Sequence, residues 1–244
     1  MTIALTLLMF FLANAGIATA TNLTKETLQK FEKCDAYNIG TGDCAKNIER
    51  SVLSKNNNTV SRHKNILKIH TAARLIEFEG KPDKGDQSYW YSYLGYFKEI
   101  GYYLIHIQYW EGDEAILVSN ATGQQVTLSA IPQVSPSKNR IISVEGSEAY
   151  NKNGVTVWRV SHGNLVEEFR YEPQGYVLYK FLKWIGDSKI LLEKSTRSKG
   201  KFCPKGSQVT LQEQLELHGE KWALIADSDP KSVKCHKDYD IEEH

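Results

Sequence analysis

From residue 66 onward the chain is a succession of short runs of β-branched and aromatic residues, separated by Gly, Asn, Asp and Pro. Runs of this length that end at turn-forming residues are typical of β-strands. Their density leaves little room for helices, so the sequence predicts an all-β body. The candidate strands are ILKIHTAARLIEF, SYWYSYLGYF, YYLIHIQYW, AILVS, QQVTLSA, RIISVE, VTVWRVS, LVEEFRYE, YVLYKFLKWI, KILLEK, QVTLQEQLEL and KWALIAD.

The run VTVWRVS carries apolar side chains on both of its faces. In an extended strand Val155 and Val157 point to one side, whereas Trp158 and Val160 point to the other. A strand that is apolar on both faces is typical of an inner strand that is covered on each side.

Two segments of the β region resemble each other. WEGDEAILVS begins at Trp110 and WIGDSKILLE begins at Trp184, and they share Trp, Gly, Asp, Ile and Leu at the same offsets. Two units in this interval would each hold about 37 residues, close to the roughly 40–45 residues of a four-stranded propeller blade. We therefore expect a propeller-like array of antiparallel blades with four to five units, and a β-sandwich or barrel as the alternative.

Sequence motifs support this expectation through a resemblance. PQVSPSKNRIISV is similar to the SPDGKRIAF-like segment of TolB-like and WD40-like propeller repeats, with Ser135-Pro136 and Arg140-Ile141 at the matching positions. The stretch from residue 91 to about 193 also resembles uncharacterised exported bacterial β-repeat proteins. The resemblance implies a propeller-like fold and a Gram-negative periplasm, and it carries no catalytic motif.

The first residues have the pattern of a secretory leader. An apolar run from Ile3 to Leu12 is followed by Ala18-Thr19-Ala20, a small-x-small pattern that suits signal peptidase. We expect cleavage after Ala20, with an uncleaved anchor as the alternative, and a periplasmic or secreted protein without a membrane span after cleavage. The chain then divides into a signal peptide (1–20), a helical N-terminal region with a linker (21–64) and a β-rich propeller-like domain (65–244).

Export gives the four cysteines an oxidising compartment in which to pair. Of the three pairings we favour the two local ones, Cys34 with Cys44 and Cys203 with Cys235, because each closes a short loop. A zinc site is the competing interpretation, but the chain has no CxxC spacing. We therefore predict two disulfides and no metal.

The region between the leader and the strands has helical periodicity. Thr24 can cap a short helix that runs to about Lys33, and a second helix begins near Asp43, with Ala45, Ile48 and Val52 on one face. The first disulfide would tie these two helices together. The polar run from residue 54 to residue 64 is expected to be a linker.

Composition and motifs exclude several functions. The chain has 30 basic and 29 acidic residues, a formal net charge of +1, so it has no overall field to attract nucleic acid. Nucleophile motifs such as GxSxG, SxxK and HExxH are absent, as are glycine-rich phosphate loops. We expect no cofactor.

Aromatic residues concentrate between residues 89 and 110. Rings on a β surface bind sugars or partner proteins well, but rings also fill the cores between sheets. Our candidates for a binding surface are Tyr91, Tyr93, Tyr102, His106, Trp110 and Glu111. His106 is also readily explained as a structural histidine.

The sequence thus favours a non-enzymatic exported binding protein that presents an aromatic-rich β surface to a protein or cell-envelope polymer, with an inhibitor or immunity-type protein as a special case. The alternative is a hydrolase or lyase that acts on polysaccharide or peptide through dispersed carboxylates such as Glu111 and Asp113. A purely structural role in an envelope complex would have the same sequence features.

Overall fold

The computed structural model describes residues 20–36, 41–55, 58–146, 153–201, 203–226 and 233–236. The described residues are mostly in antiparallel β-sheets, which confirms the all-β prediction for the body. The expected leader lies outside the described residues apart from Ala20. Among the described helices, none is long and apolar enough to cross a membrane.

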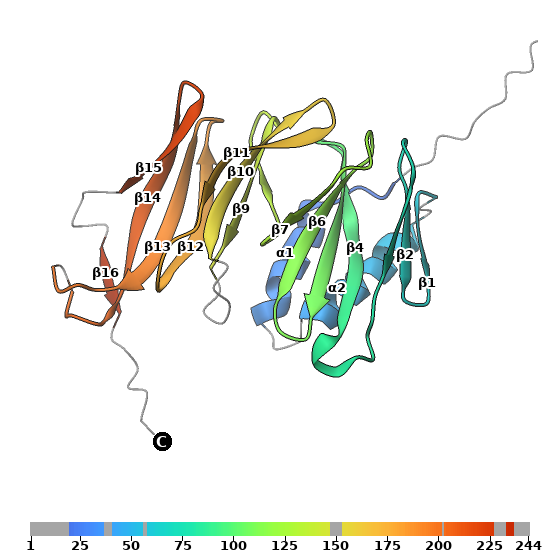
Figure 1. Cartoon of the computed structure of the whole chain (residues 1–244), viewed down its shortest axis with the longest axis horizontal. Coiled ribbons are helices and arrows are strands. Elements are labelled where there is room, and N and C mark those ends of the chain that lie inside the picture. The colour runs from blue at the N-terminus through green and yellow to red at the C-terminus, as the bar shows by residue number, and fades with distance from the viewer. Residues whose placement is uncertain are drawn as a thin grey trace, which may run out of the picture.

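Four sheets follow one another in chain order (Figure 1). Three of them are meanders in which each strand pairs with the next, and the fourth sheet adds β16 beside β14. The strands of the first sheet are β1 (Val60–His63), β2 (Ile66–His70) and β3 (Leu75–Glu79); of the second, β4 (Tyr89–Phe97), β5 (Tyr102–Tyr109), β6 (Asp113–Ser119) and β7 (Gln125–Leu128); of the third, β8 (Gln133–Val134), β9 (Arg140–Glu145), β10 (Gly154–Ser161) and β11 (Asn164–Tyr171); of the fourth, β12 (Val177–Ile185), β13 (Lys189–Arg197), β14 (Gln208–His218), β15 (Lys221–Ala226) and β16 (Lys234–His236).

Two apolar cores hold the row of sheets together. The first lies among the helices, the first two sheets and one face of the third sheet, and the second lies between the third and fourth sheets. Strand β10 belongs to both, because Trp158 is buried in the first core while Val155 and Val157 are buried in the second. The prediction that VTVWRVS is an inner strand covered on each side is confirmed.

The row of sheets does not close into a ring (Figure 1). At one end, β3 turns Ile76 and Phe78 toward the core and the charged Glu77 and Glu79 toward solvent. A sheet with a polar outer face needs no further sheet to cover it, which is how a row of stacked units can end.

The two similar segments occupy different places in their sheets. The first forms the turn between β5 and β6, the second and third strands of their sheet, whereas the second forms the turn between β12 and β13, the first and second strands. Shared Gly-Asp turns therefore reflect similar hairpins and do not mark equivalent positions in two units.

Both helices form close to where the sequence predicts them. Helix α1 (Lys25–Ala36) begins after Thr24, whose hydroxyl oxygen accepts a hydrogen bond from the Thr27 N–H at 3.1 Å. Helix α2 (Thr41–Leu53) buries the predicted face of Ala45, Ile48 and Val52. The prediction of a linker over residues 54–64 is wrong for its last part. Residues Val60–His63 form strand β1, and Val60 is buried in the first core.

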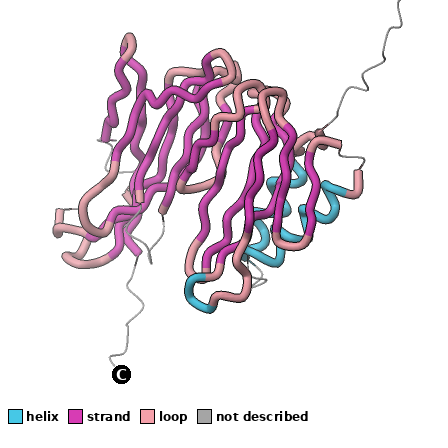
Figure 2. Tube along the Cα trace, turned by 45° about the vertical axis from the view of Figure 1, so that its right-hand side comes forward, coloured by secondary structure: helices cyan, strands magenta, loops and turns pink. Residues whose placement is uncertain are grey.

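The helical region lies beside the second sheet (Figures 1 and 2). Strand β4 is an edge strand that has no neighbouring strand along most of its outer side. The helical region supplies hydrogen-bond partners for backbone groups on this side. The Tyr93 N–H donates to a carboxylate oxygen of Glu49 at 2.7 Å, and the backbone of Tyr96 exchanges hydrogen bonds with Thr21 and Leu23. Unpaired backbone groups along a sheet edge would otherwise invite pairing with another chain.

Glu49 is held in place by a buried ion pair. Arg62 of β1 donates to both of its carboxylate oxygens, at 2.8 and 2.6 Å, and also donates to the Tyr91 carbonyl. Both charged side chains are largely buried. Removal of one partner would leave the other charge buried and unpaired, a change that costs about 3–5 kcal/mol.

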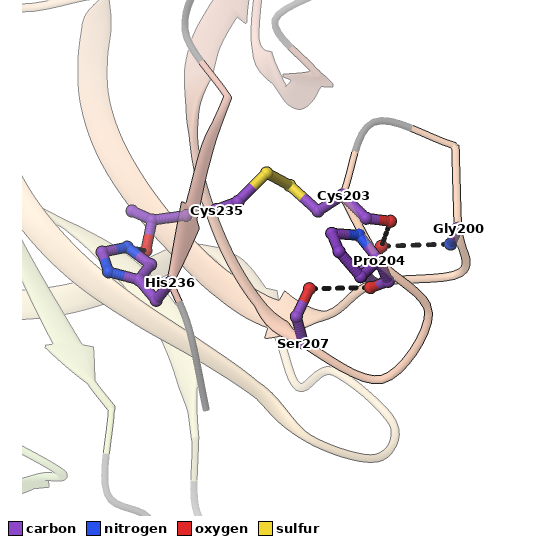
Figure 3. Close-up of a disulfide and its surroundings, with 8 residues drawn as sticks. Gly200, Cys203, Pro204, Ser207, Cys235 and His236 are labelled. Carbon is purple, nitrogen blue, oxygen red and sulfur yellow. Dashed lines mark hydrogen bonds between the residues drawn. A yellow bond between two sulfur atoms is a disulfide. The ribbon is translucent and has the colours of Figure 1, made fainter. Parts of the chain in front are cut away.

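The two predicted disulfides are both present. Cys34–Cys44 joins α1 to α2, as expected. Cys203–Cys235 joins β16 to the loop between β13 and β14 (Figure 3). Disulfides persist in oxidising compartments, so they are consistent with an extracytoplasmic environment.

The loop-closure model predicts unequal contributions from the two disulfides. The sequence separations are 32 residues for Cys203–Cys235 and 10 for Cys34–Cys44. Because the longer loop restricts the unfolded chain more, the double variant C203S/C235S should lose about 4 kcal/mol of unfolding free energy and C34S/C44S about 3 kcal/mol. Urea denaturation of the three proteins measures both losses. Unchanged midpoints in the variants, or four free thiols in the native protein, would contradict the assignment.

Candidate functional site

A pocket lined by aromatic rings lies where the end of β5 meets the start of β4 and the first turn of α2. Its volume is about 340 Å³. We call it the aromatic pocket, and the residues that line it are Gly42, Asp43, Lys46, Pro82, Ser88, Tyr89, Trp90, Gln108, Tyr109 and Trp110.

Backbone and amide hydrogen bonds fix the shape of this pocket. The Trp110 N–H donates to the Ser88 carbonyl at 3.1 Å, which joins the β5–β6 turn to the segment before β4. The Gln108 amide donates to the carbonyls of Tyr109 and Gly112, at 2.9 and 3.1 Å. A Cβ at Gly42 would lie 2.9 Å from Gln108 Cγ, so glycine allows α2 to approach the strand this closely.

The rings of the pocket are positioned by contacts with each other and with cations. Tyr89 and Tyr109 lie with ring centroids 6.5 Å apart, and the Lys46 ammonium lies 5.3 Å from the Trp90 ring. Tyr109 donates its hydroxyl to Glu114 at 2.9 Å. Burial, and then this hydrogen bond to a carboxylate, raise the pKa of Tyr109 well above its usual range, so it remains a neutral phenol.

Of the residues predicted for a binding surface, Trp110 lines the aromatic pocket and is 65% exposed. Glu111 is exposed beside it in the turn. Tyr91 is partly buried, with its ring 5.1 Å from that of Phe78.

Tyr93 and Tyr102 lie in the first core instead, His106 is buried against Phe31 of that core, and none of the three reaches the surface. Both faces of β5 are covered, so its alternation does not separate a core face from a solvent face. Tyr102 links two sheets, because its hydroxyl donates to the Gly163 carbonyl in the β10–β11 turn at 2.8 Å. Burial raises the pKa of Tyr102 to about 12.

His106 belongs to a cluster of titratable groups between the second and third sheets. Its Nε2 lies 2.7 Å from a carboxylate oxygen of Asp113, and the Phe31 ring of α1 packs edge-on against the imidazole at 4.8 Å. With 1% exposure the imidazole cannot meet a substrate directly. Burial raises the pKa of Glu145, at the end of β9, to about 7, and the negative charge of Asp113 adds to the effect.

Asp113 and Asp187, which occupy equal positions in the two similar segments, make different contacts. Asp113 faces a buried histidine, whereas Asp187 accepts a hydrogen bond from the Ser137 N–H at 2.8 Å. Equal positions in the two similar segments therefore do not give these two carboxylates equivalent contacts.

Asp43, Lys46, Ser88 and Gln108 belong to the aromatic pocket but were missed as site residues by sequence reasoning. Their chemistry is common on surfaces, and the two from α2 lie far along the chain from Trp110. Within the described residues, no cluster of three or more His, Cys, Asp or Glu side chains could hold a metal ion.

In comparisons with known proteins, no family model, no curated protein and no solved structure matches the chain.

Glu145 predicts a pH dependence of stability. Its pKa is about 7 in the folded protein, against an ordinary value of 4.5, so the folded state keeps a proton that the unfolded chain loses between these pH values. By linkage, its stabilising contribution is complete below about pH 4.5 and is lost as the pH rises through 7. In Glu145→Gln that part of the decline should disappear.

Urea midpoints of the native protein and of Glu145→Gln at pH 5, 6, 7 and 8 measure this difference. Glu172→Gln, which changes an exposed carboxyl of the same sheet region, is the matched control. An identical pH profile for the native protein and Glu145→Gln would contradict the assignment.

Proposed function

We propose that the protein is an exported, non-enzymatic binding protein, periplasmic or secreted, that presents the aromatic pocket to a protein or a cell-envelope polymer. The observation that carries this proposal is Trp110, which is 65% exposed on a hairpin held by backbone hydrogen bonds. Exposed tryptophans at the rim of a formed pocket are typical anchors of binding sites.

The packing of the second sheet supports the proposal. We infer that the sheets form an open propeller-like array, in which each meander corresponds to one blade. The β4–β5 and β5–β6 hairpins then present Tyr89 and Trp110 from a sheet that is packed on both faces. A site on such strands holds its rings in place before the partner arrives, which reduces the entropic cost of binding.

Two disulfides and the leader-like first residues support export. The same features fit a protein that works outside the cytoplasm, where polymers of the cell envelope and secreted proteins are the available partners.

A hydrolase fits the pocket less well. Glycoside hydrolysis canonically uses two carboxyl groups that flank the same bond. Among the described residues that line the pocket, Asp43 is the single carboxyl group, while Glu111 and Asp113 are not part of the lining. The raised pKa of Glu145 suits a general acid, but this group lies in the cluster with Asp113 and the buried imidazole of His106, away from the pocket lining.

Affinity capture tests the proposal. The immobilised protein should retain a defined component of a periplasmic or secreted extract, and Trp110→Ala should lose it, because truncation removes the exposed ring without opening the core. Ile225→Ala is the control, since Ile225 is also exposed (41%) but lies on β15, away from the pocket.

Mass spectrometry and monosaccharide analysis identify what is retained, and circular dichroism confirms that both variants are folded. Equal retention by the native protein and Trp110→Ala would contradict the proposed surface, as would the absence of any retained component.

A further inference from the structure

The aromatic pocket combines rings with hydrogen-bonding groups and offers little aliphatic surface. Four of its lining residues are aromatic, and Asp43, Lys46, Ser88 and Gln108 supply polar groups. Among the described lining residues, no Val, Leu or Ile is present and Pro82 is the sole aliphatic ring. A lipid chain would make few aliphatic contacts with such a lining. A ligand with both C–H faces and hydroxyl groups could contact the rings and also bond to the polar groups.

The charges of the pocket favour a neutral ligand. Lys46 Nζ lies 3.5 Å from Asp43 Oδ1, so the single cation and the single anion of the described lining are paired with each other. An anionic polymer or an acidic peptide would need an excess of cations to offset the loss of its hydration. A hydroxyl group, by contrast, donates to a carboxylate and accepts from an ammonium group, and can therefore bond to both.

The size and the opening of the pocket favour a chain that passes across it. Its volume of about 340 Å³ is at the lower end of the range for ligand pockets, roughly 300–1,000 Å³. Trp110 stands at the rim with most of its surface in solvent, while Tyr89 and Trp90 are partly buried at the wall. The pocket therefore suits a short stretch of a longer molecule that continues beyond the Trp110 ring.

We propose that the aromatic pocket binds a neutral polysaccharide, with a pyranose ring stacked on Trp110 and its hydroxyl groups bonded to Asp43 and Lys46. This inference rests on the proposed function and names the chemical class of its partner. The apolar C–H face of a pyranose matches the face of an indole, and its equatorial hydroxyls reach polar side chains at the ring's edge. A protein partner is the other outcome of the test.

Tryptophan fluorescence and isothermal titration calorimetry test the inference with purified protein and four soluble probes: cello-, chito-, xylo- and malto-oligosaccharides. We expect at least one probe to bind. Trp110→Ala should weaken that binding by roughly tenfold or more, as the loss of an aromatic anchor does. Trp110→Phe keeps a ring and should retain most of the affinity, and Ile225→Ala should change nothing.

Lys46→Met provides a second test, because it keeps the length of the side chain but removes the hydrogen-bond donor. It should weaken binding of the same probe while the fold persists, since Lys46 is a surface residue of α2. Binding of no probe, or binding that Trp110→Ala leaves unchanged, would overturn the inference. If the protein captures another protein through Trp110 but binds no oligosaccharide, the polysaccharide inference is overturned. The proposed function as a binding protein then remains in place.

Discussion

The carboxylate of Glu49 joins the helical N-terminal region to the β body. It accepts a hydrogen bond from the Tyr93 N–H at the open edge of β4 and is held there by two hydrogen bonds from Arg62. One helix, one strand of the first sheet and one strand of the second sheet thus meet at a single buried ion pair. If either partner of this pair is lost, the charge of the other stays buried and unpaired. The three elements must therefore be positioned together.

This arrangement also builds the aromatic pocket. Glu49 lies near the middle of α2, and the first turn of the same helix provides Gly42, Asp43 and Lys46 as one wall of the pocket. The opposite wall comes from β4, whose edge Glu49 closes, and from the neighbouring strand β5. The Trp90 ring lies close to both Lys46 and Arg62, at 5.3 and 4.7 Å, and so connects the pocket to the ion pair. The pocket thus depends on the docking of α2.

Local patterns in the sequence predicted much of the fold. The face of α2, the cap at Thr24 and the two disulfides involve residues close in the chain, where spacing alone constrains geometry. The position of β10 between two cores also follows from its composition, because Trp158 and Val157 point to opposite faces and both need cover.

The accessibility of the aromatic residues could not be predicted in the same way. Tyr102 and Tyr103 alternate as in any half-buried strand, yet both are buried because a sheet or helix covers each face of β5. Which face is covered depends on contacts with elements distant in the chain, such as Gly163 for Tyr102 and His70 for Tyr103. The contribution of Asp43 and Lys46 to the pocket has the same origin, since it results from the docking of α2 on the sheet.

The central claim is that the helical region closes the edge of β4 and thereby sets the pocket. Hydrogen exchange of the Tyr93 and Tyr96 amides, followed by NMR in the native protein, tests it most directly. If the edge is closed, these two amides should exchange as slowly as those of Leu104 and Ile105 in the interior strand β5. Exchange at the fast rate of a solvent-exposed edge strand would contradict the claim.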